Sequence, residues 1–386
     1  MNLATISPEM RLILAGALFP LQPDERDHLR HLCQSSVDWP AFLTLTIYHH
    51  LAPLLYANLK RHAADLVPPE TLAALQTRTA QNRQRVLALM VEANTLRALL
   101  APAGIPFCLL KGPPLSQQLY GDVALRTTAD LDVLIHETQL DETDVRLKQA
   151  GFQRTTPAVD LTPRQWRVFK RLIHHFVYVH TMRGTHLELH WTLATPDLLP
   201  PAAMEQIWQR AQAAPTPGRL ADPDQVCYLI LHGARHGWEQ LKWLADIAMF
   251  LRQTPSPDWE TVRAQMDALD LLRPLGQALL LARALFQAPI PPALSPLLED
   301  RAIQRFAAQA MEIIFEGFGA GAGQGRRWRA LHYGTGMKAS WRFKLAVLSQ
   351  LWMTEDDWEE IALPDALFPL YFVLRPLLWF RRYRMR

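Results

Sequence analysis

The sequence predicts an α+β protein in which a small mixed β-sheet lies between two helical regions of the chain. Apolar residues recur at helical spacing before about residue 104 and again after about residue 221. The intervening segment holds short apolar runs that are typical of strands. The 386 residues, 49% of them hydrophobic, suffice for more than one domain. We therefore predict a helical region at 1–104, an α/β core at 105–220 and a second helical region at 221–386.

The elements follow in chain order. Residues 70–100 carry leucine, valine and methionine at helical spacing, and Gly104 ends that helix. Residues 107–110 and 131–135 are short apolar runs, and each predicts a strand. Residues 141–150 predict a short polar helix between the second strand and the rest of the core.

Two further strands are predicted at 176–182 and 185–191. The dipeptide Arg183-Gly184 between them suits a tight hairpin turn, in which glycine supplies a positive φ. After residue 221 the pattern is helical again. Residues 223–250 predict one long helical region, or two helices that meet near Gly233 or Gly237.

Two segments near the end of the chain have unusual composition. Residues 317–325 read GFGAGAGQG, without the Lys-Ser/Thr pair of a phosphate-binding loop, which favours a connector. Residues 366–380 are apolar and precede an arginine-rich end, but they are too short to span a bilayer. We expect them to dock on the core as terminal helices; peripheral contact with a membrane surface is the less favoured alternative.

Charge and cysteine content restrict the functional classes. The chain has 40 Lys+Arg against 37 Asp+Glu, a net charge of +3, which does not indicate a nucleic-acid partner. The three cysteines are far apart and form neither a disulfide framework nor a zinc motif. The N-terminus lacks the pattern of a signal peptide. These features predict a cytoplasmic protein.

Asp130 and Asp132 are the leading candidate site residues. They stand two apart at the start of the strand predicted at 131–135, so both side chains should point to the same open face. Two adjacent carboxylates repel each other unless a cation lies between them. Mg²⁺, or alternatively Mn²⁺, fits this role when phosphates complete its coordination shell.

Glu188 is the candidate for a third carboxylate. In HLELHW the residues His186, Glu188 and His190 alternate with leucines, which predicts one polar and one apolar strand face. A strand with its polar face in water would show the same pattern. With the aspartates present, we favour a metal ligand at Glu188, with His190 orienting it or contacting phosphate.

Positive charge precedes the aspartates. Lys111 and Gly112 end a strand and lead into a helix at about 114–119, whose free amide groups suit an anion. Arg126 lies four residues before Asp130 and could bind phosphate through two hydrogen bonds, or form a structural ion pair.

A second polar group lies downstream. On an ideal helix His232, His236, Trp243 and Asp246 share one stripe. Three interpretations stay open: a zinc pair, a satisfied structural cluster, and a face over the site on which Trp243 stacks a base and the histidines contact phosphate.

The segments LLKGPPLSQQLYGDVALRTTADLDVLIH, LELHW and LHGARHGWEQLKWLADIAMFL together resemble the bacterial uncharacterised nucleotidyltransferase family, part of the DNA-polymerase-β-like superfamily. The resemblance covers about residues 45–250. It implies a nucleotidyltransferase core with a metal-binding Asp-x-Asp pair, here Asp130 and Asp132, and a third acid, here Glu188. The chain departs from the superfamily where Lys111-Gly112-Pro113 replaces a Gly-Ser start to the first helix.

The resemblance implies Mg²⁺-dependent transfer of a nucleoside monophosphate from a nucleoside triphosphate to an acceptor hydroxyl. Lys111 and Arg126 would neutralise phosphate charge. The acceptor is a small molecule, a peptide or a protein. Attack on the γ-phosphorus would instead make the chain a kinase. Because the Gly-Ser start is missing, a degenerate nucleotide-binding module is a third interpretation.

Overall fold

The computed structural model describes residues 6–214, 218–254, 257–316, 324–349, 358, 360–361, 363–371 and 373–375. The chain forms two compact units. Unit 1 comprises residues 1–94, 110–129 and 221–337, and unit 2 comprises residues 95–109, 130–220 and 338–386. This division joins segments that are far apart in the chain. The predicted domain boundaries, which follow chain order, stay a prediction.

Unit 1 is helical in its described part. Its elements are α1 (Pro8–Gly16), α2 (Pro23–Cys33), α3 (Trp39–Tyr48), α4 (Ala52–His62), most of α5 (Pro69–Leu100), α6 (Pro113–Tyr120), α10 (Asp222–Arg235), α11 (Leu241–Arg252), α12 (Trp259–Ala268), α13 (Leu272–Phe286), η4 (Pro292–Glu299), α14 (Arg301–Glu316) and α15 (Gln324–Gly334). α1 packs against α2, α3 and α4, and α13 packs against α10, α11, α12 and α14.

The turn between α10 and α11 determines how these two helices pack. Gly237 and Trp238 have φ of 61° and 56°, so the helical region predicted at 223–250 is two helices that meet near Gly237. The Trp238 ring lies against Gly233, where an added Cβ would meet a ring carbon at 2.2 Å. Its Nε1 donates to Oε1 of the buried Gln277 at 2.9 Å. Gly233 is therefore required for close packing of this turn.

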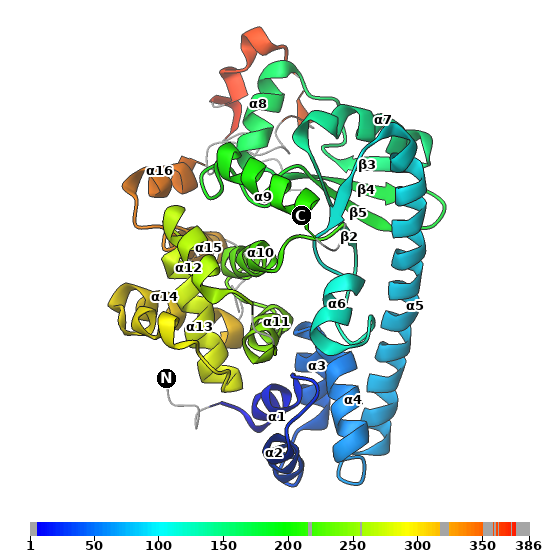
Figure 1. Cartoon of the computed structure of the whole chain (residues 1–386), viewed down its shortest axis with the longest axis vertical. Coiled ribbons are helices and arrows are strands. Elements are labelled where there is room, and N and C mark those ends of the chain that lie inside the picture. The colour runs from blue at the N-terminus through cyan, green and yellow to red at the C-terminus, as the bar shows by residue number, and fades with distance from the viewer. Residues whose placement is uncertain are drawn as a thin grey trace. The chain divides into compact units, whose positions relative to one another are not determined.

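Unit 2 contains a five-stranded mixed sheet in the order β1-β2-β5-β4-β3 (Figure 1). The strands are β1 (Phe107–Leu109), β2 (Leu131–Ile135), β3 (Phe152–Thr156), β4 (His175–His180) and β5 (His186–His190). The other elements are the end of α5, η2 (Ala101–Ala103), η3 (Glu137–Gln139), α7 (Leu140–Gln149), α8 (Pro163–Leu172), α9 (Pro201–Ala213), α16 (Trp341–Ser349) and η6 (Asp365–Leu367).

The strand pairing confirms most of the predicted core. β4 and β5 form the predicted antiparallel hairpin, and Gly184 in its turn has φ of 64°. β2 pairs with β1 in antiparallel and with β5 in parallel orientation. The edge strand β3 was not predicted, because its sequence FQRTT is mostly polar. The mixed sheet with surrounding helices agrees with the predicted α+β class.

One face of the sheet is aromatic. Phe176 of β4 and Trp191, which follows β5, lie against Trp166 and Phe169 of α8, with ring centroids 5.4 to 6.1 Å apart. Strand alternation directs Glu188 and His190 to the opposite face. Burial of the aromatic face therefore fixes which residues the other face presents.

Two predictions concern regions that the structure describes in part. The glycine-dense connector falls on residues 317–323, outside the described residues, and its last two residues begin α15. Within the C-terminal segment, Phe368 and Tyr371 are buried in unit 2, and the Gln165 side chain donates to the Tyr371 hydroxyl at 3.3 Å. Residues 372 and 376–386 lie outside the described part. The described part of the C-terminal segment is therefore docked on unit 2, as expected.

A second apolar segment, besides residues 366–380, lies before the sheet. Residues Pro69–Ala103, which contain α5, are helical, and they are long and apolar enough to span a bilayer. A third of the most apolar stretch is buried. A core helix of a soluble protein meets the same criterion, so this single helix is weak evidence for a membrane location.

Candidate functional site

Asp132, Glu188 and His190 come together on one face of the sheet in unit 2. Parallel pairing places Asp132 of β2 directly beside Glu188 of β5, and His190 beside Leu134. One ligand atom from each of the three side chains lies within 4.8 Å of the others. The predicted third carboxylate therefore lies beside the Asp-x-Asp strand, and strand register is the physical reason.

The group is less exposed than the sequence suggested. The side chains of Asp132 and His190 are 3% and 2% exposed, and that of Glu188 is 28% exposed. The expectation of an open face was wrong for Asp132, because β2 lies between two strands and is buried along its length. The alternative of a strand face in open water does not fit β5 either, because His190 is buried and Glu188 is only partly exposed. His186 begins β5 and is exposed.

Asp130 stands apart from this group. It immediately precedes β2, is partly exposed, and is absent from the ligating groups found among the described residues. The predicted pairing of its carboxylate with that of Asp132 on one strand face is therefore not seen. The strand begins at Leu131, as predicted, so Asp130 lies outside it. Its role as a metal ligand stays a prediction.

His190 lies between two carboxylates. Its Nε2 is 3.4 Å from Oδ1 of Asp132 and 3.3 Å from Oε2 of Glu188, but neither contact is aligned as a hydrogen bond. Burial alone would lower the pKa of His190, but the two carboxylates outweigh it and raise the pKa. Burial alone would raise the pKa of Glu188, whereas His190 and His175 outweigh it and lower the pKa. The fold thus holds two acids around one imidazole.

Two further histidines extend the group. His174 and His175 lie before and at the start of β4, and His175 pairs with His190 across the sheet. The ring centroids of His174 and His175 are 5.5 and 4.8 Å from that of His190. The sequence analysis missed both, although IHHFVYVH and HLELH are rich in histidine. Only the antiparallel register shows that these histidines meet.

The donor set fits a divalent cation. Carboxylate oxygens suit Mg²⁺ and Mn²⁺, and an imidazole nitrogen shifts the preference toward a transition metal such as Mn²⁺. Neither nitrogen of His190 has an aligned hydrogen bond among the described residues. A neutral imidazole has one nitrogen without a proton, and a metal ion could bind that nitrogen.

The other predicted site residues belong to unit 1. Nζ of Lys111 lies 5.7 Å from the centroid of the Tyr228 ring. Gly112 is the N-terminal cap of α6, and its φ of 74° is a conformation that side chains rarely adopt. The phosphate-binding roles of Lys111 and Gly112 stay predictions.

Arg126 and Asp246 form a buried ion pair in unit 1. Nε of Arg126 donates to Oδ2 of Asp246 at 2.8 Å, and the Tyr120 hydroxyl donates to Oδ1 at 3.0 Å. The side chains of Arg126 and Asp246 are 4% and 0% exposed. Arg126 therefore forms a structural ion pair, which was the predicted alternative to phosphate binding, and its partner is Asp246. Asp246 is fully enclosed, so it positions Arg126 and does not itself face a ligand.

The rings of His232, His236 and Trp243 form a cluster in unit 1. Their centroids are 4.8 to 5.3 Å apart. One continuous helix was the predicted cause, but the rings meet because α10 and α11 pack against each other. Burial, and then the charge of Lys111, holds the pKa of His232 well below its usual value. The His232 ring meets the Trp243 ring edge to face, with an interplanar angle of 87°. The phosphate- and base-binding roles of this cluster stay predictions.

A family model described as uncharacterised nucleotidyltransferase matches residues 35–287, which is more than half of the 386 residues. No curated protein and no solved structure matches the chain. The matched range includes the acid group of unit 2 and the Arg126–Asp246 pair of unit 1. The chain therefore belongs to the uncharacterised nucleotidyltransferase family.

Proposed function

We propose that this nucleotidyltransferase transfers a nucleoside monophosphate from a nucleoside triphosphate to a hydroxyl group of a separate acceptor. We further propose that its core belongs to the DNA-polymerase-β-like superfamily and that Mg²⁺ or Mn²⁺ is required. One observation carries the proposal: the parallel register that puts Asp132 beside Glu188, with His190 against both.

The three side chains would hold the cation from one face of the sheet. Asp132 and Glu188 supply negative oxygens, and His190 supplies a nitrogen or keeps Glu188 in position. A cation bound there would neutralise charge on the phosphates. Because β2 and β5 are hydrogen-bonded neighbours, the two carboxylates are preorganised and lose little side-chain freedom on binding.

The reaction is an in-line displacement at the α-phosphorus. The acceptor hydroxyl oxygen forms a bond to that phosphorus while the bond to the bridging oxygen breaks, and pyrophosphate leaves. The hydroxyl proton passes to a carboxylate of the site or to water. Attack at the γ-phosphorus would use the same acids and release a nucleoside diphosphate.

Release of pyrophosphate in the presence of each nucleoside triphosphate, candidate acceptors and Mg²⁺ or Mn²⁺ tests the proposal. We expect Asp132→Asn and Glu188→Gln each to lower the rate by about 10²- to 10³-fold, since a preorganised charge is lost. Asp141→Asn, an exposed change on α7, is the matched control and should retain full rate.

Mass spectrometry of the acceptor separates the alternatives. Addition of a full nucleotide supports the proposal, whereas addition of one phosphate establishes the kinase reaction instead. Calorimetry with nucleotide and metal distinguishes a degenerate nucleotide-binding module from an active enzyme. Nucleotide binding that needs no metal and survives Asp132→Asn, without any turnover, would refute the catalytic proposal.

A further inference from the structure

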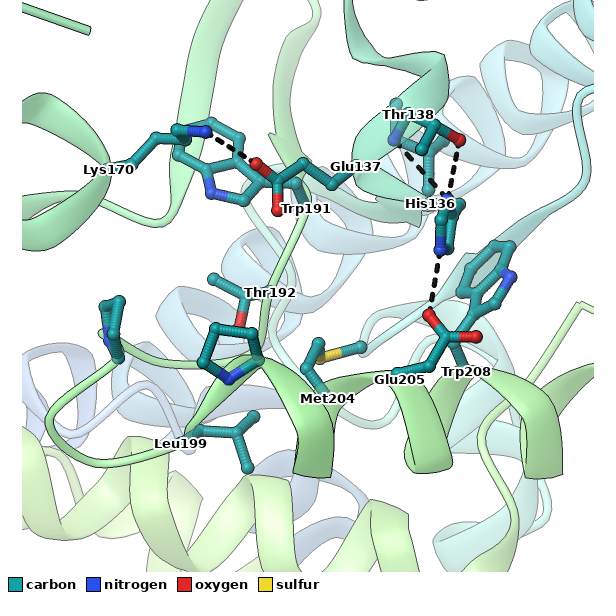
Figure 2. Close-up of a pocket in the computed structure, with 13 residues that line it drawn as sticks. His136, Glu137, Thr138, Lys170, Trp191, Thr192, Leu199, Met204, Glu205 and Trp208 are labelled. Atoms are coloured by element: carbon teal, nitrogen blue, oxygen red, sulfur yellow. Dashed lines mark hydrogen bonds and ion pairs between the residues drawn. The ribbon is translucent and has the colours of Figure 1, made fainter. Parts of the chain in front are cut away.

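A cavity of about 600 Å³ lies at the carboxyl ends of β2 and β5 in unit 2 (Figure 2). Ile135 ends β2 and Trp191 follows β5, and both line the cavity. The volume is in the range of pockets that enclose small organic molecules. Asp132 is three residues before Ile135 on the same strand, roughly 10 Å along the backbone, and its side chain points to the opposite face of the sheet.

The lining of this cavity is largely apolar and aromatic. Trp191, Leu199, Met204 and Trp208 are all buried residues that contribute to it (Figure 2). Trp191 is supported from behind by Trp166, at 5.4 Å between ring centroids. Rigid indole rings and an adaptable methionine thioether favour flat rings, and aromatic contacts of this kind contribute about 1 kcal/mol beyond burial.

One ion pair and one histidine–carboxylate contact border the cavity. Lys170 Nζ lies 2.7 Å from Oε1 of Glu137, and His136 Nε2 lies 2.9 Å from Oε2 of Glu205 (Figure 2). Nδ1 of His136 lies 2.7 Å from Oγ1 of Thr138, which holds the ring in place.

The border carries two carboxylates against one ammonium group. Hydrogen bonds from His136 and Gln209 keep the pKa of Glu205 below its ordinary value, so this carboxylate stays an acceptor. A triphosphate would meet like charge here. A neutral ring whose edge carries O–H or N–H donors would find an acceptor at Glu205 and apolar contact with Trp208.

We infer that this cavity binds a flat aromatic or heteroaromatic ring that carries a hydrogen-bond donor on its edge. This inference rests on the proposed function. The ring then belongs to one of the two substrates: it is a phenol or aromatic alcohol of the acceptor, or the base of the nucleotide.

Ligand-observed NMR and calorimetry on the full chain test the inference without metal or triphosphate. One arm uses tyramine and 4-hydroxybenzyl alcohol, and the other uses adenosine, guanosine, cytidine and uridine. We expect saturable binding in at least one arm. The first arm identifies the acceptor ring, and the second identifies the nucleobase.

Variants at Glu205 locate the binding. Glu205 is exposed on α9, so Glu205→Trp should fill the cavity without disturbing the core, and should weaken binding by about tenfold or more. Glu205→Gln should weaken binding by about fivefold, because a neutral amide oxygen accepts a hydrogen bond about 1 kcal/mol more weakly than a carboxylate. Glu142→Gln, an exposed change on α7, is the matched control and should leave affinity unchanged.

Absence of saturable binding in both arms would overturn the inference, and so would binding that Glu205→Trp leaves intact. Neither result depends on turnover. Ring binding without pyrophosphate release would preserve the inferred site and refute the proposed reaction, so the two failures can be told apart.

Discussion

Each unit of this protein contains a buried cluster of charged groups, and the two clusters are built differently. In unit 1, the opposite charges of Arg126 and Asp246 cancel, and both oxygens of Asp246 accept aligned hydrogen bonds, of 2.8 Å from Arg126 and 3.0 Å from Tyr120. In unit 2, Asp132 and Glu188 share the imidazole of His190, at 3.4 and 3.3 Å respectively and without hydrogen-bond alignment. A satisfied pair is a structural element, whereas an excess of negative charge held by a sheet is suited to binding a cation.

The largest effect is expected when one partner of the Arg126–Asp246 pair is removed. Asp246→Ala should lower the free energy of unfolding by about 3–5 kcal/mol, because it leaves the buried Arg126 guanidinium without its carboxylate partner. Denaturant unfolding followed by circular dichroism measures the change.

The double variant Arg126→Met/Asp246→Leu is the control, because it removes both charges and should recover most of the lost stability. If Asp246→Ala proves as stable as the wild type, the pair is not the structural element described here.

A second prediction concerns a buried neutral group of unit 1. Burial lowers the pKa of His49 to about 4, and its Nδ1 accepts from the Leu241 backbone. As the pH falls from about 6.5 to about 4, the unfolded chain takes up a proton that folded His49 does not. Stability is therefore lost over this interval, by up to about 3 kcal/mol at its acid end.

Unfolding titrations at several pH values, for wild type and His49→Gln, isolate this contribution. The variant should show a shallower loss of stability between pH 6.5 and pH 4. Parallel pH profiles for the two proteins would show that His49 does not contribute.

The third and smallest effect concerns metal binding by the acid group of unit 2. Mn²⁺ at about one hundred times its dissociation constant should stabilise the folded chain by about 2.7 kcal/mol, because the unfolded chain cannot gather the three ligands. Asp132→Asn should abolish this gain. Thermal unfolding with and without Mn²⁺ measures the difference, and equal stabilisation of Asp132→Asn would exclude Asp132 as a ligand.

Local sequence patterns predicted much of the fold. The bounds of β2 agree with the structure, and the β4–β5 hairpin follows from alternation and the Arg183-Gly184 turn. Apolar runs and turn residues act over a few neighbours, so one sequence is enough to recognise them. The polar edge strand β3 carries no such signal.

The site was predicted only in part, because its geometry depends on pairing between distant segments. The sequence indicated Asp132 and Glu188, and the parallel register brings them together. It did not indicate that Asp130 lies outside the group, that His174 and His175 join it, or that Asp132 is buried. Burial depends on the neighbouring strands, and a strand's own residues do not specify those neighbours.

The parallel register of β2 and β5 also restricts how the gene for this chain can change length. Side chains alternate along a strand, so one codon gained or lost within β2 would turn Asp132 to the aromatic face and separate it from Glu188. The segments that join the two strands face a weaker restriction, because closing a longer loop costs little extra free energy. Insertions and deletions among relatives should therefore accumulate between these strands and be absent within them.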